Sequence, residues 1–407
     1  MTTIRIRRLP EDFQVDEISR VEPTSGEFAL YRLAKRSLTT LEAVETIARN
    51  WNIPHRNIQY AGMKDKHAIT IQYITINHGP RENFKTALAD LTYLGLTPRA
   101  IGPADIAANR FSITLRNFSD DAKPRIDRAI RELQEYYVPN YFDDQRFRSL
   151  GPSREFVAKY WCESNYEKSL WLSLAEDNSS DRAEEKAEKR ILQTHWGKWA
   201  GMKDQLSRSH RRSIVTYLVD HPADFRGAFE RVRVELRRIY LSAYQSYLWN
   251  HILSNFVQKS TPRESLLIFP HVCGGLPCYQ TLDHDTFAEF SQLAIPLPSA
   301  RVKAPDPEVL EFMESSLAEI GVSMHQIRVK HGRDAYFATA ARPALSRPNS
   351  FVYGWDADEL YPGRKLLRLS FELRPGAYAS IIMKRLTAGL ADALPDAADF
   401  DDDERGY

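Results

Sequence analysis

The residues best suited to chemistry lie in one short stretch, Gly62–Gln72, with the sequence GMKDKHAITIQ. A glycine opens the stretch, Asp65 stands between two lysines, and a run rich in β-branched residues follows from Ile69 to Ile76. Glycine permits a tight turn, and the β-branched run is typical of a strand. We therefore expect Asp65 on a loop at the mouth of a sheet, where catalytic residues are common.

The charges around Asp65 suggest what it could do. Neighbouring cations lower the pKa of a carboxyl group and keep it ionised near neutral pH. A fixed carboxylate in a cationic setting suits a nucleophile that acts on an anionic substrate. The alternative is a solvated turn with ordinary surface charges, which composition alone favours.

The size and composition of the chain indicate a globular protein of two domains. With 407 residues the chain exceeds one typical hydrophobic core. Its hydrophobic share of 43% and charged share of 27% are ordinary. The net charge of +1 says little about nucleic acid, because an acidic segment at residues 396–404 (DAADFDDDE) hides a more basic body. We expect that segment to be disordered and leave it out of the fold.

The cysteines and the missing motifs narrow the class of protein. Three cysteines are too few for a disulfide framework and suit a reducing compartment. His271, Cys273 and Cys278 match no standard zinc spacing, so we expect small buried residues around a Gly-Gly turn and no metal. Dinucleotide, P-loop, H-E-x-x-H and G-x-S-x-G motifs are absent, which gives no support to a cofactor.

No apolar run reaches the length that spans a membrane, and the N-terminus lacks the apolar segment of a signal peptide. We therefore expect a soluble cytoplasmic protein without a membrane partner. The sequence says nothing of the oligomeric state.

The elements before Asp65 alternate between strand and helix. Residues 4–7, 13–15 and 28–33 have the apolar pattern of strands. Thr39 and Glu42 have the spacing of a capping box, and the periodicity that follows predicts a helix over 39–51. A short strand then leads to the Asp65 loop.

The next elements complete a strand-and-helix layer. Residues 110–116 (RFSITLR) alternate, which predicts a strand with Phe111 on its apolar face. Pro124 begins a predicted helix whose apolar stripe is Ile126, Ala129, Ile130 and Leu133. Together they predict a domain of the α+β class.

The character of the chain changes near Gly151 and returns to sheet near its end. Residues 155–205 look polar and helical, a later stripe of Leu241, Tyr244, Leu248 and Ile252 predicts a buried helix face, and residues 261–309 are rich in proline and predict loops and short strands. A strand is expected over 365–373 and a helix over 377–390. Two similar regions around a different middle indicate one domain split by an insertion.

Six segments stand in order along most of the chain. They are Arg7-x-x-Pro10-Glu11-Asp12-Phe13-x-Val15, Gly62-x-Lys64-Asp65-x-x-Ala68-x-Thr70-x-Gln72, Asn109-Arg110-Phe111, Pro139-Asn140-Tyr141-Phe142-x-x-Gln145-Arg146-Phe147, Leu241-Ser242-Ala243-Tyr244-Gln245-Ser246 and Pro375-Gly376-Ala377-Tyr378-Ala379. In this order they resemble the motifs of the TruD family of tRNA pseudouridine synthases. Asp143 and Arg148 stand where the family often has glycine, so the turn over residues 143–150 is expected to depart from the family.

The resemblance implies a fold of the α+β class. It implies a catalytic domain of the pseudouridine-synthase fold, with a mixed, largely antiparallel sheet, interrupted by an inserted α/β TRUD domain. We expect residues 1–152 and 345–395 to form the catalytic domain and residues 153–344 the insertion. Residues 396–407 would be an acidic tail.

The resemblance also implies an activity, the isomerisation of a specific uridine in RNA, which we expect to be uridine-13 of tRNA. Neither a cofactor nor a metal is required. Asp65 takes the position of the catalytic aspartate, Arg7 that of the basic residue that pairs with it, and Asn109 and Phe111 those of two residues that line the uridine pocket. The carboxylate could attack C1′ of the sugar or C6 of the base, or abstract a sugar proton.

Several of these residues have a plainer alternative. A base inside folded RNA must be flipped out, and Phe111 would stack on it, whereas an inward residue of an alternating strand is ordinarily core. Asn109 offers a donor and an acceptor to the uracil edge. Arg7 could instead form a surface salt bridge worth at most about 1 kcal/mol.

The remaining candidates are basic residues that could contact RNA phosphates. Lys64, Lys66 and His67 flank Asp65 and could instead only solubilise the loop. The insertion contributes a basic cluster, which taken alone is more often a solvated face, at Arg208, Arg211 and Arg212. We expect Thr70 and Gln72 to brace the loop by hydrogen bonds rather than to contact substrate.

Three other functions are compatible with the residues. The stretch between Arg148 and Leu241 is long, which leans toward archaeal and eukaryotic relatives and leaves open a broader synthase acting on other RNAs. A non-catalytic RNA-binding protein could keep the fold. A hydrolase could use Asp65 with Asp12 through a bound water.

Overall fold

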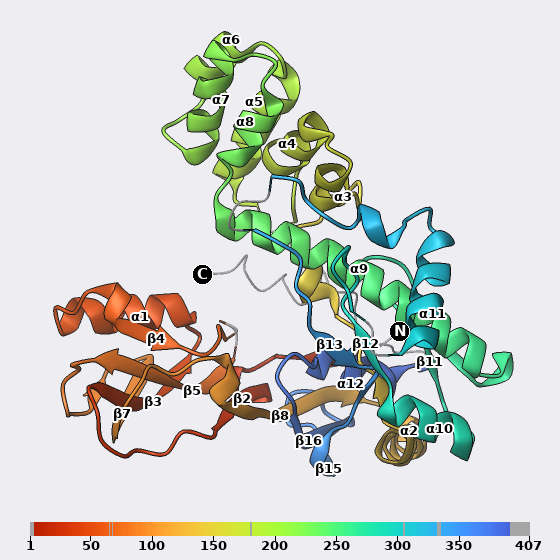
Figure 1. The fold of residues 1–407 in the computed structure, drawn as a ribbon. Coiled ribbons are helices and arrows are strands. Elements are labelled where there is room, and N and C mark those ends of the chain that lie inside the picture. Colours follow the sequence, from red (N-terminus) through yellow and green to blue (C-terminus); the bar gives the residue numbers. More distant parts are fainter. Residues whose placement is uncertain are drawn as a thin grey trace. The chain divides into compact units, whose positions relative to one another are not determined.

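A computed structural model describes residues 4–64, 66, 68–179, 181–303, 306–331 and 335–390. Asp65, His67 and the acidic tail therefore lie outside the described residues. The described chain forms two compact units (Figure 1): Pro139–Leu345 form the second, and the chain up to Val138 and again from Ser346 forms the first. The domain borders expected from the sequence, at residues 152/153 and 344/345, stay a prediction.

The first unit is built on a mixed, largely antiparallel sheet, as predicted. The order across it is β15 (Asn349–Ala357), β16 (Lys365–Leu373), β8 (Ile106–Phe118), β2 (Phe13–Ser19), β5 (Ile69–Asn77), β3 (Phe28–Arg36), β7 (Ala89–Thr97) and β6 (Phe84–Lys85). The short strand β1 (Arg5–Ile6) pairs with β8, and β4 (Ile58–Tyr60) pairs with β5. Among the pairings of the described strands in this sheet, β2 with β5 is parallel.

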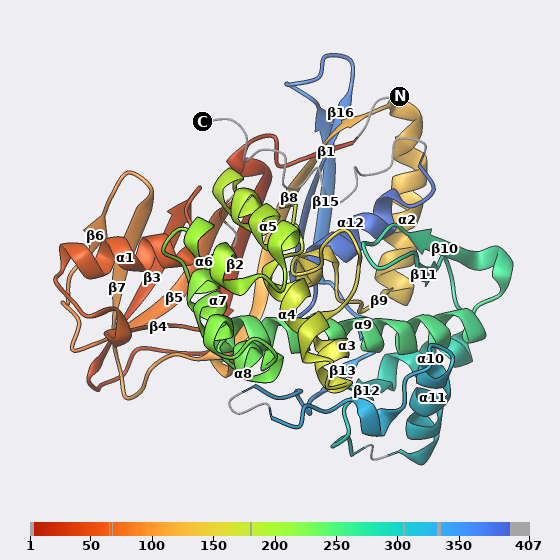
Figure 2. The same ribbon diagram turned by 90° about the horizontal axis from the view of Figure 1, so that it is seen from above.

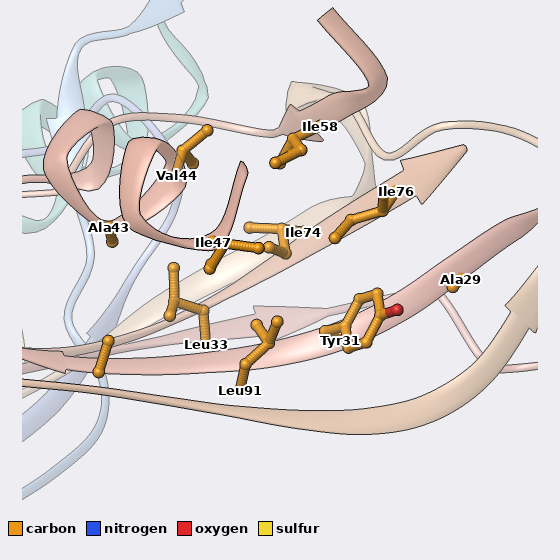
Figure 3. Packing of buried hydrophobic residues seen from close by; sticks show 11 residues of the cluster. Ala29, Tyr31, Leu33, Ala43, Val44, Ile47, Ile58, Ile74, Ile76 and Leu91 are labelled. Carbon is orange, nitrogen blue, oxygen red and sulfur yellow. The ribbon is translucent and has the colours of Figure 1, made fainter. Parts of the chain in front are cut away.

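Helix α1 (Thr40–Asn50) covers strands β3, β5 and β7, and its predicted capping box is confirmed. Thr39 Oγ1 accepts the Glu42 N–H at 3.1 Å, and the Glu42 carboxylate accepts the Thr39 N–H at 2.7 Å. Ala43, Val44 and Ile47 face the buried side chains of the strands in Figure 3. Burying a Val or Ile side chain stabilises a fold by about 1.5–3 kcal/mol, so this contact holds α1 against the sheet.

Two further helices complete the first unit. The predicted stripe of α2 (Lys123–Tyr136) is buried, and α12 (Ala379–Thr387) packs against it. Arg385 of α12 pairs with Glu132 of α2 at 2.7 Å, and the Trp355 Nε1–H of β15 donates to Asp127 at 2.9 Å. Helix α12 is shorter than the expected 377–390.

The second unit is organised around the helix α9 (Val234–Ser260), on which the whole predicted apolar stripe is buried. The other helices are α3 (Val157–Cys162), α4 (Tyr166–Leu174), α5 (Ala183–His195), α6 (Trp199–Gln205), α7 (His210–Asp220), α8 (Phe225–Glu230), α10 (His284–Gln292) and α11 (Pro307–Ala318). Helix α11 lies beside α9 (Figure 2). Small antiparallel pairs join β10 (Leu266–Phe269) to β11 (Leu276–Tyr279) and β12 (Ala294–Pro296) to β13 (Ala341–Pro343). The chain passes between the two units at β9 (Val138–Pro139) and β14 (Leu345–Ser346).

Two local expectations need correction or comment. Helix α10 falls where loops and short strands were expected; it is capped by Asp283, which accepts the Thr286 N–H at 2.9 Å, but it buries only Phe290, so its periodicity is weak. At the turn over 143–150, Asp143 has φ −98° and Arg148 φ −56°. These values suit any residue, so the turn does not require glycine.

No helix in the described part of the chain is both long and apolar enough to cross a membrane.

Candidate active site

The loop before Asp65 is held by hydrogen bonds from α1 and β5. The Lys64 N–H donates to Thr40 Oγ1 at 2.9 Å, and that hydroxyl donates to Gln72 Oε1 at 2.8 Å. Gln72 Nε2 in turn donates to the Gly62 carbonyl at 3.3 Å. Thr40 and Gln72 are buried, so these bonds form away from competing water and hold the loop firmly. The expected bracing role of Gln72 is confirmed.

The side chain of Lys64 is held inside the protein. Its Nζ lies 2.9 Å from Glu17 Oε1 and donates to Asn109 Oδ1 at 2.6 Å. Glu17 is only 4% exposed, and its second oxygen accepts the Tyr73 N–H at 3.0 Å. Removing one partner from such a buried pair leaves a charge that water cannot solvate. These contacts therefore attach Lys64, the residue before Asp65, to β2 and β8.

The strand register collects the other pocket candidates on one face of the sheet. Across β2 and β8, Glu17 lies opposite Asn109 and Val15 lies opposite Phe111. Across β2 and β5, Val15 lies opposite Thr70. Residues directly opposite one another project from the same face, so Asn109 and Phe111 lie on the face that carries Glu17 and Thr70. The Thr70 hydroxyl is buried and makes no hydrogen bond to the described residues, so the expectation that Thr70 braces the loop by hydrogen bonds was wrong.

Phe111 belongs to a group of aromatic rings on this face. Its ring stacks on Phe371 with centres 5.7 Å apart and meets the edge of Phe13 at 6.3 Å. Phe351 stacks in turn on Phe371 at 5.4 Å. Phe111 remains half-buried whereas Phe13 and Phe371 are buried, so Phe111 is the ring of these three that keeps most access to a ligand.

Arg7 lies over the same aromatic group. Its backbone has φ +57°, a left-handed conformation that is uncommon outside glycine, and its guanidinium carbon lies 4.1 Å from the centre of the Phe13 ring. This distance is within the range of a cation–π contact. The pairing of Arg7 with Asp65 involves a residue outside the described set and stays a prediction.

Asp12 is engaged in a buried ion-pair network. It is 1% exposed and accepts from Nε and Nη2 of Arg116 at 2.8–3.0 Å. Arg116 also binds Asp358 at 3.2 Å and Glu359 at 2.9 Å, and its hydrogen bonds to Asp12 raise the pKa of the guanidinium further. A carboxylate held in this way has no room to activate a water, which removes the support for a hydrolase using Asp12.

The basic candidates differ in their exposure and in their ion pairs. Lys66 is exposed and lies 3.5 Å from Glu42. In the second unit Arg208 is exposed and Arg212 half-buried, while Arg211 pairs with Glu188 at 3.2 Å and with Glu185 at 3.9 Å. Residues Arg208–Arg212 include the N-cap of α7, Ser209, and the first residues of that helix. Contact of these residues with RNA stays a prediction.

The cysteines are free thiols, and the described part of the chain contains one group that could bind a metal ion. It consists of Asp143, Asp144 and His271, whose ligand atoms lie within 4.8 Å of one another. His271 Nε2 lies 3.5 Å from Asp144 Oδ1, an oxygen that also accepts the Val272 N–H at 2.8 Å, and His271 Nδ1 accepts the Cys273 N–H at 3.1 Å. The expectation that no metal binds here stays a prediction.

Two residues beside the loop were missed by reasoning from the sequence: Glu17, which pairs with Lys64, and Lys35, whose Nζ donates to the Lys64 carbonyl at 3.5 Å. Glu17 follows Phe13 and Val15 at a spacing of two, and Lys35 follows Tyr31 and Leu33 in the same way. Both charged residues are therefore in phase with buried apolar residues of a strand, and both are buried. A charge in phase with the core was the available signal, because such a charge needs a specific partner.

Comparisons with known proteins show which family the chain belongs to. Residues 1–386 match the family model described as tRNA pseudouridine synthase D (TruD). The "Probable tRNA pseudouridine synthase D 2" of Methanocaldococcus jannaschii is 32% identical over 397 residues, which span 95% of this chain and 92% of that protein. The "tRNA pseudouridine synthase D" of Aquifex aeolicus is 27% identical over 393 residues, which span 94% and 98%.

The fold agrees as well. A crystal structure of the Methanosarcina mazei protein assigned as tRNA pseudouridine synthase D superposes with a TM-score of 0.69 at 25% identity, covering 95% of this chain and 93% of that one. The family match and these relatives therefore define a pseudouridine synthase, an isomerase that converts uridine in RNA to pseudouridine. Within that class, the chain belongs to the TruD family of tRNA pseudouridine synthases.

Proposed function

We propose that this enzyme isomerises uridine-13 of tRNA and that Asp65 is its nucleophile. The observation that carries the proposal is the restraint on Lys64, the residue before Asp65. Its N–H is held by Thr40 and its ammonium by Glu17 and Asn109. A carboxylate attached to so well-fixed a residue can be preorganised for reaction.

The reaction requires the protein to position the uridine and to supply one reactive carboxylate. The N1–C1′ bond breaks, the uracil turns and a C5–C1′ bond forms, while C5 loses a proton and N1 gains one. The composition of the nucleoside and its oxidation state do not change. Asp65 attacks C1′ or C6, or abstracts a sugar proton, and each route needs the carboxylate ionised and held in place.

The residues on the sheet face would receive the flipped base. Phe111 offers the partly exposed face of its ring for stacking. Asn109 would present its amide to the uracil edge while its oxygen accepts from Lys64. Arg7, held over Phe13, would keep Asp65 ionised and oriented.

Backbone contacts would supply most of the affinity for tRNA. We assign them to Lys66 and His67 beside the site and to Arg208, Arg211 and Arg212 in the second unit. Arg208 and Lys66 are the exposed members for which the structure describes a side chain. Since the substrate is tRNA, we place the enzyme in the cytoplasm.

A tritium-release assay tests the chemistry. Wild-type protein and Asp65→Asn are incubated with tRNA transcripts that carry tritium at C5 of uridine. The proposal predicts release by the wild type alone, without free uracil or chain cleavage. Tight binding without release from any cellular RNA would indicate an RNA-binding protein instead. Release from RNAs other than tRNA at similar rates would indicate a broader synthase.

A further inference from the structure

We propose that Lys35 is a positioning residue for catalysis: its buried ammonium fixes the backbone of the loop that carries Asp65 and adds to Arg7 a second positive charge that keeps this carboxylate ionised. The inference rests on the proposed role of Asp65. It adds a residue that none of the six sequence motifs contains.

The burial of Lys35 is the first observation. Lys35 is 2% exposed, near the end of β3, on the strand face that also carries Tyr31 and Leu33. Lysine is among the residues least often buried, because removing an ammonium from water costs several kcal/mol. Because burial of this ammonium is costly, we look for its role in the groups that it contacts.

The contacts of Lys35 show where that place is. Its Nζ donates to the Leu38 carbonyl at 2.6 Å and to the Lys64 carbonyl at 3.5 Å. The Lys64 carbonyl belongs to the peptide bond that joins Lys64 to Asp65. Across the sheet, Lys35 lies opposite Thr70 on β5, which projects from the site face. The ammonium therefore lies directly beside the backbone that leads into Asp65.

The neighbouring charges explain why this cation matters. The two lysines that flank Asp65 each lie close to a carboxylate: Lys64 is 2.9 Å from Glu17, and Lys66 is 3.5 Å from Glu42. Their field at Asp65 is therefore partly cancelled. Lys35 adds a positive charge from β3 in a buried setting, where screening by water is weak.

The described charged groups that contact one another at the loop come from three elements and the loop itself. They are Glu17 from β2, Lys35 from β3, Glu42 from α1, and Lys64 and Lys66 of the loop. Arg7, over the Phe13 ring, is the further cation assigned to Asp65. Lys66 and Glu42 are each more than two-fifths exposed, so water screens them. Removing the charge of Lys35 therefore changes the field at the loop more than removing that of Lys66.

The test is the pH dependence of single-turnover tritium release by the full chain, for the wild type, Lys35→Met and Lys35→Gln. A nearby positive charge lowers the pKa of a carboxyl group. Both variants should therefore move the acidic limb of the profile to higher pH, with unchanged affinity for tRNA. Lys35→Gln keeps a donor for the loop carbonyls, so it should lose less rate than Lys35→Met on the alkaline plateau.

Lys189→Met is the matched control, because Lys189 is also a buried lysine, paired with Asp181 at 2.6 Å in the second unit. Its profile should match the wild type at temperatures at which it is folded. A wild-type profile in both folded Lys35 variants would overturn the proposal. So would failure of both to fold, since Lys35 would then serve stability. Activity in Asp65→Asn would instead overturn the proposed function, whatever the Lys35 variants do.

Discussion

The buried pair between Glu17 and Lys64 makes a quantitative prediction. Glu17→Gln removes the carboxylate charge but keeps an oxygen that can accept the Tyr73 N–H. The Lys64 ammonium, with its side chain 13% exposed, then loses the counter-charge that lies 2.9 Å away. Breaking a buried pair costs about 3–5 kcal/mol, and the slight exposure of Lys64 places the expected loss near the lower end, about 3 kcal/mol.

The same change should slow the reaction, because a misplacement of about 1 Å can cost about a hundredfold in rate. Urea unfolding gives the stability, and single-turnover tritium release gives the rate. The double variant Glu17→Gln/Lys64→Met carries neither charge, so it should regain about 0.5–3 kcal/mol relative to the sum of the single variants.

Asp90→Asn is the control for the Glu17 prediction. Asp90 pairs with Lys85 at 3.4 Å, and the side chains are 47% and 78% exposed, so the change should cost less than about 1 kcal/mol. If Glu17→Gln costs no more than this control and leaves the rate unchanged, the pair does not hold the loop and the reasoning fails.

Three further predictions concern separate parts of the molecule. Phe111→Ala should keep the fold by circular dichroism but lose turnover; unfolding would make the ring a core residue instead. Arg116→Met should lower the free energy of unfolding by about 3–5 kcal/mol in urea, because it leaves two buried carboxylates, Asp12 and Asp358, without their cation. Burial, with Arg233 and Arg211 nearby, lowers the pKa of His210. Urea unfolding should therefore show stability falling as the pH drops below about 6.5, the usual histidine pKa, and His210→Asn should reduce this loss.

The direction in which His210 changes stability with pH follows from its different pKa values in the folded and unfolded states. Above the unfolded pKa the ring is neutral in both states, and its contribution to stability is fully present. As the pH falls toward the lower folded pKa, the unfolded chain binds a proton that the folded chain does not, and stability is lost. Equal slopes in the wild type and His210→Asn would contradict the assignment.

Local sequence patterns predicted many of the helices and strands. They could not predict which distant residues pair with one another across the sheet. The spacing of Thr39 and Glu42 and the alternation of residues 110–116 are local signals, and α1 and β8 follow them. The bond from Glu17 to Lys64 joins residues 47 positions apart and depends on the parallel register of β2 with β5. No local periodicity encodes that register, because it is set by packing of the whole sheet.

In the second unit, two buried amide side chains have structural roles that their residue type does not reveal. Gln245 lies in a motif segment and could have been assigned to substrate. Its side chain donates to the Pro298 and Ala338 carbonyls and accepts the Ala338 N–H. Asn250 of α9 likewise bonds both the N–H and the carbonyl of Phe142, at 2.9 and 2.8 Å. These amides satisfy buried backbone groups, a role that residue type alone does not distinguish from catalysis.

Mapping of pseudouridine in tRNA is the sharpest test of the proposal that Asp65 isomerises uridine-13. The map is made for cells that lack this protein and for the same cells supplied with the wild type or with Asp65→Asn. We expect position 13 to be unmodified in the deficient cells and the wild type alone to restore pseudouridine there. Pseudouridine at position 13 without the protein, or its restoration by Asp65→Asn, would show that the proposed role of Asp65 is wrong.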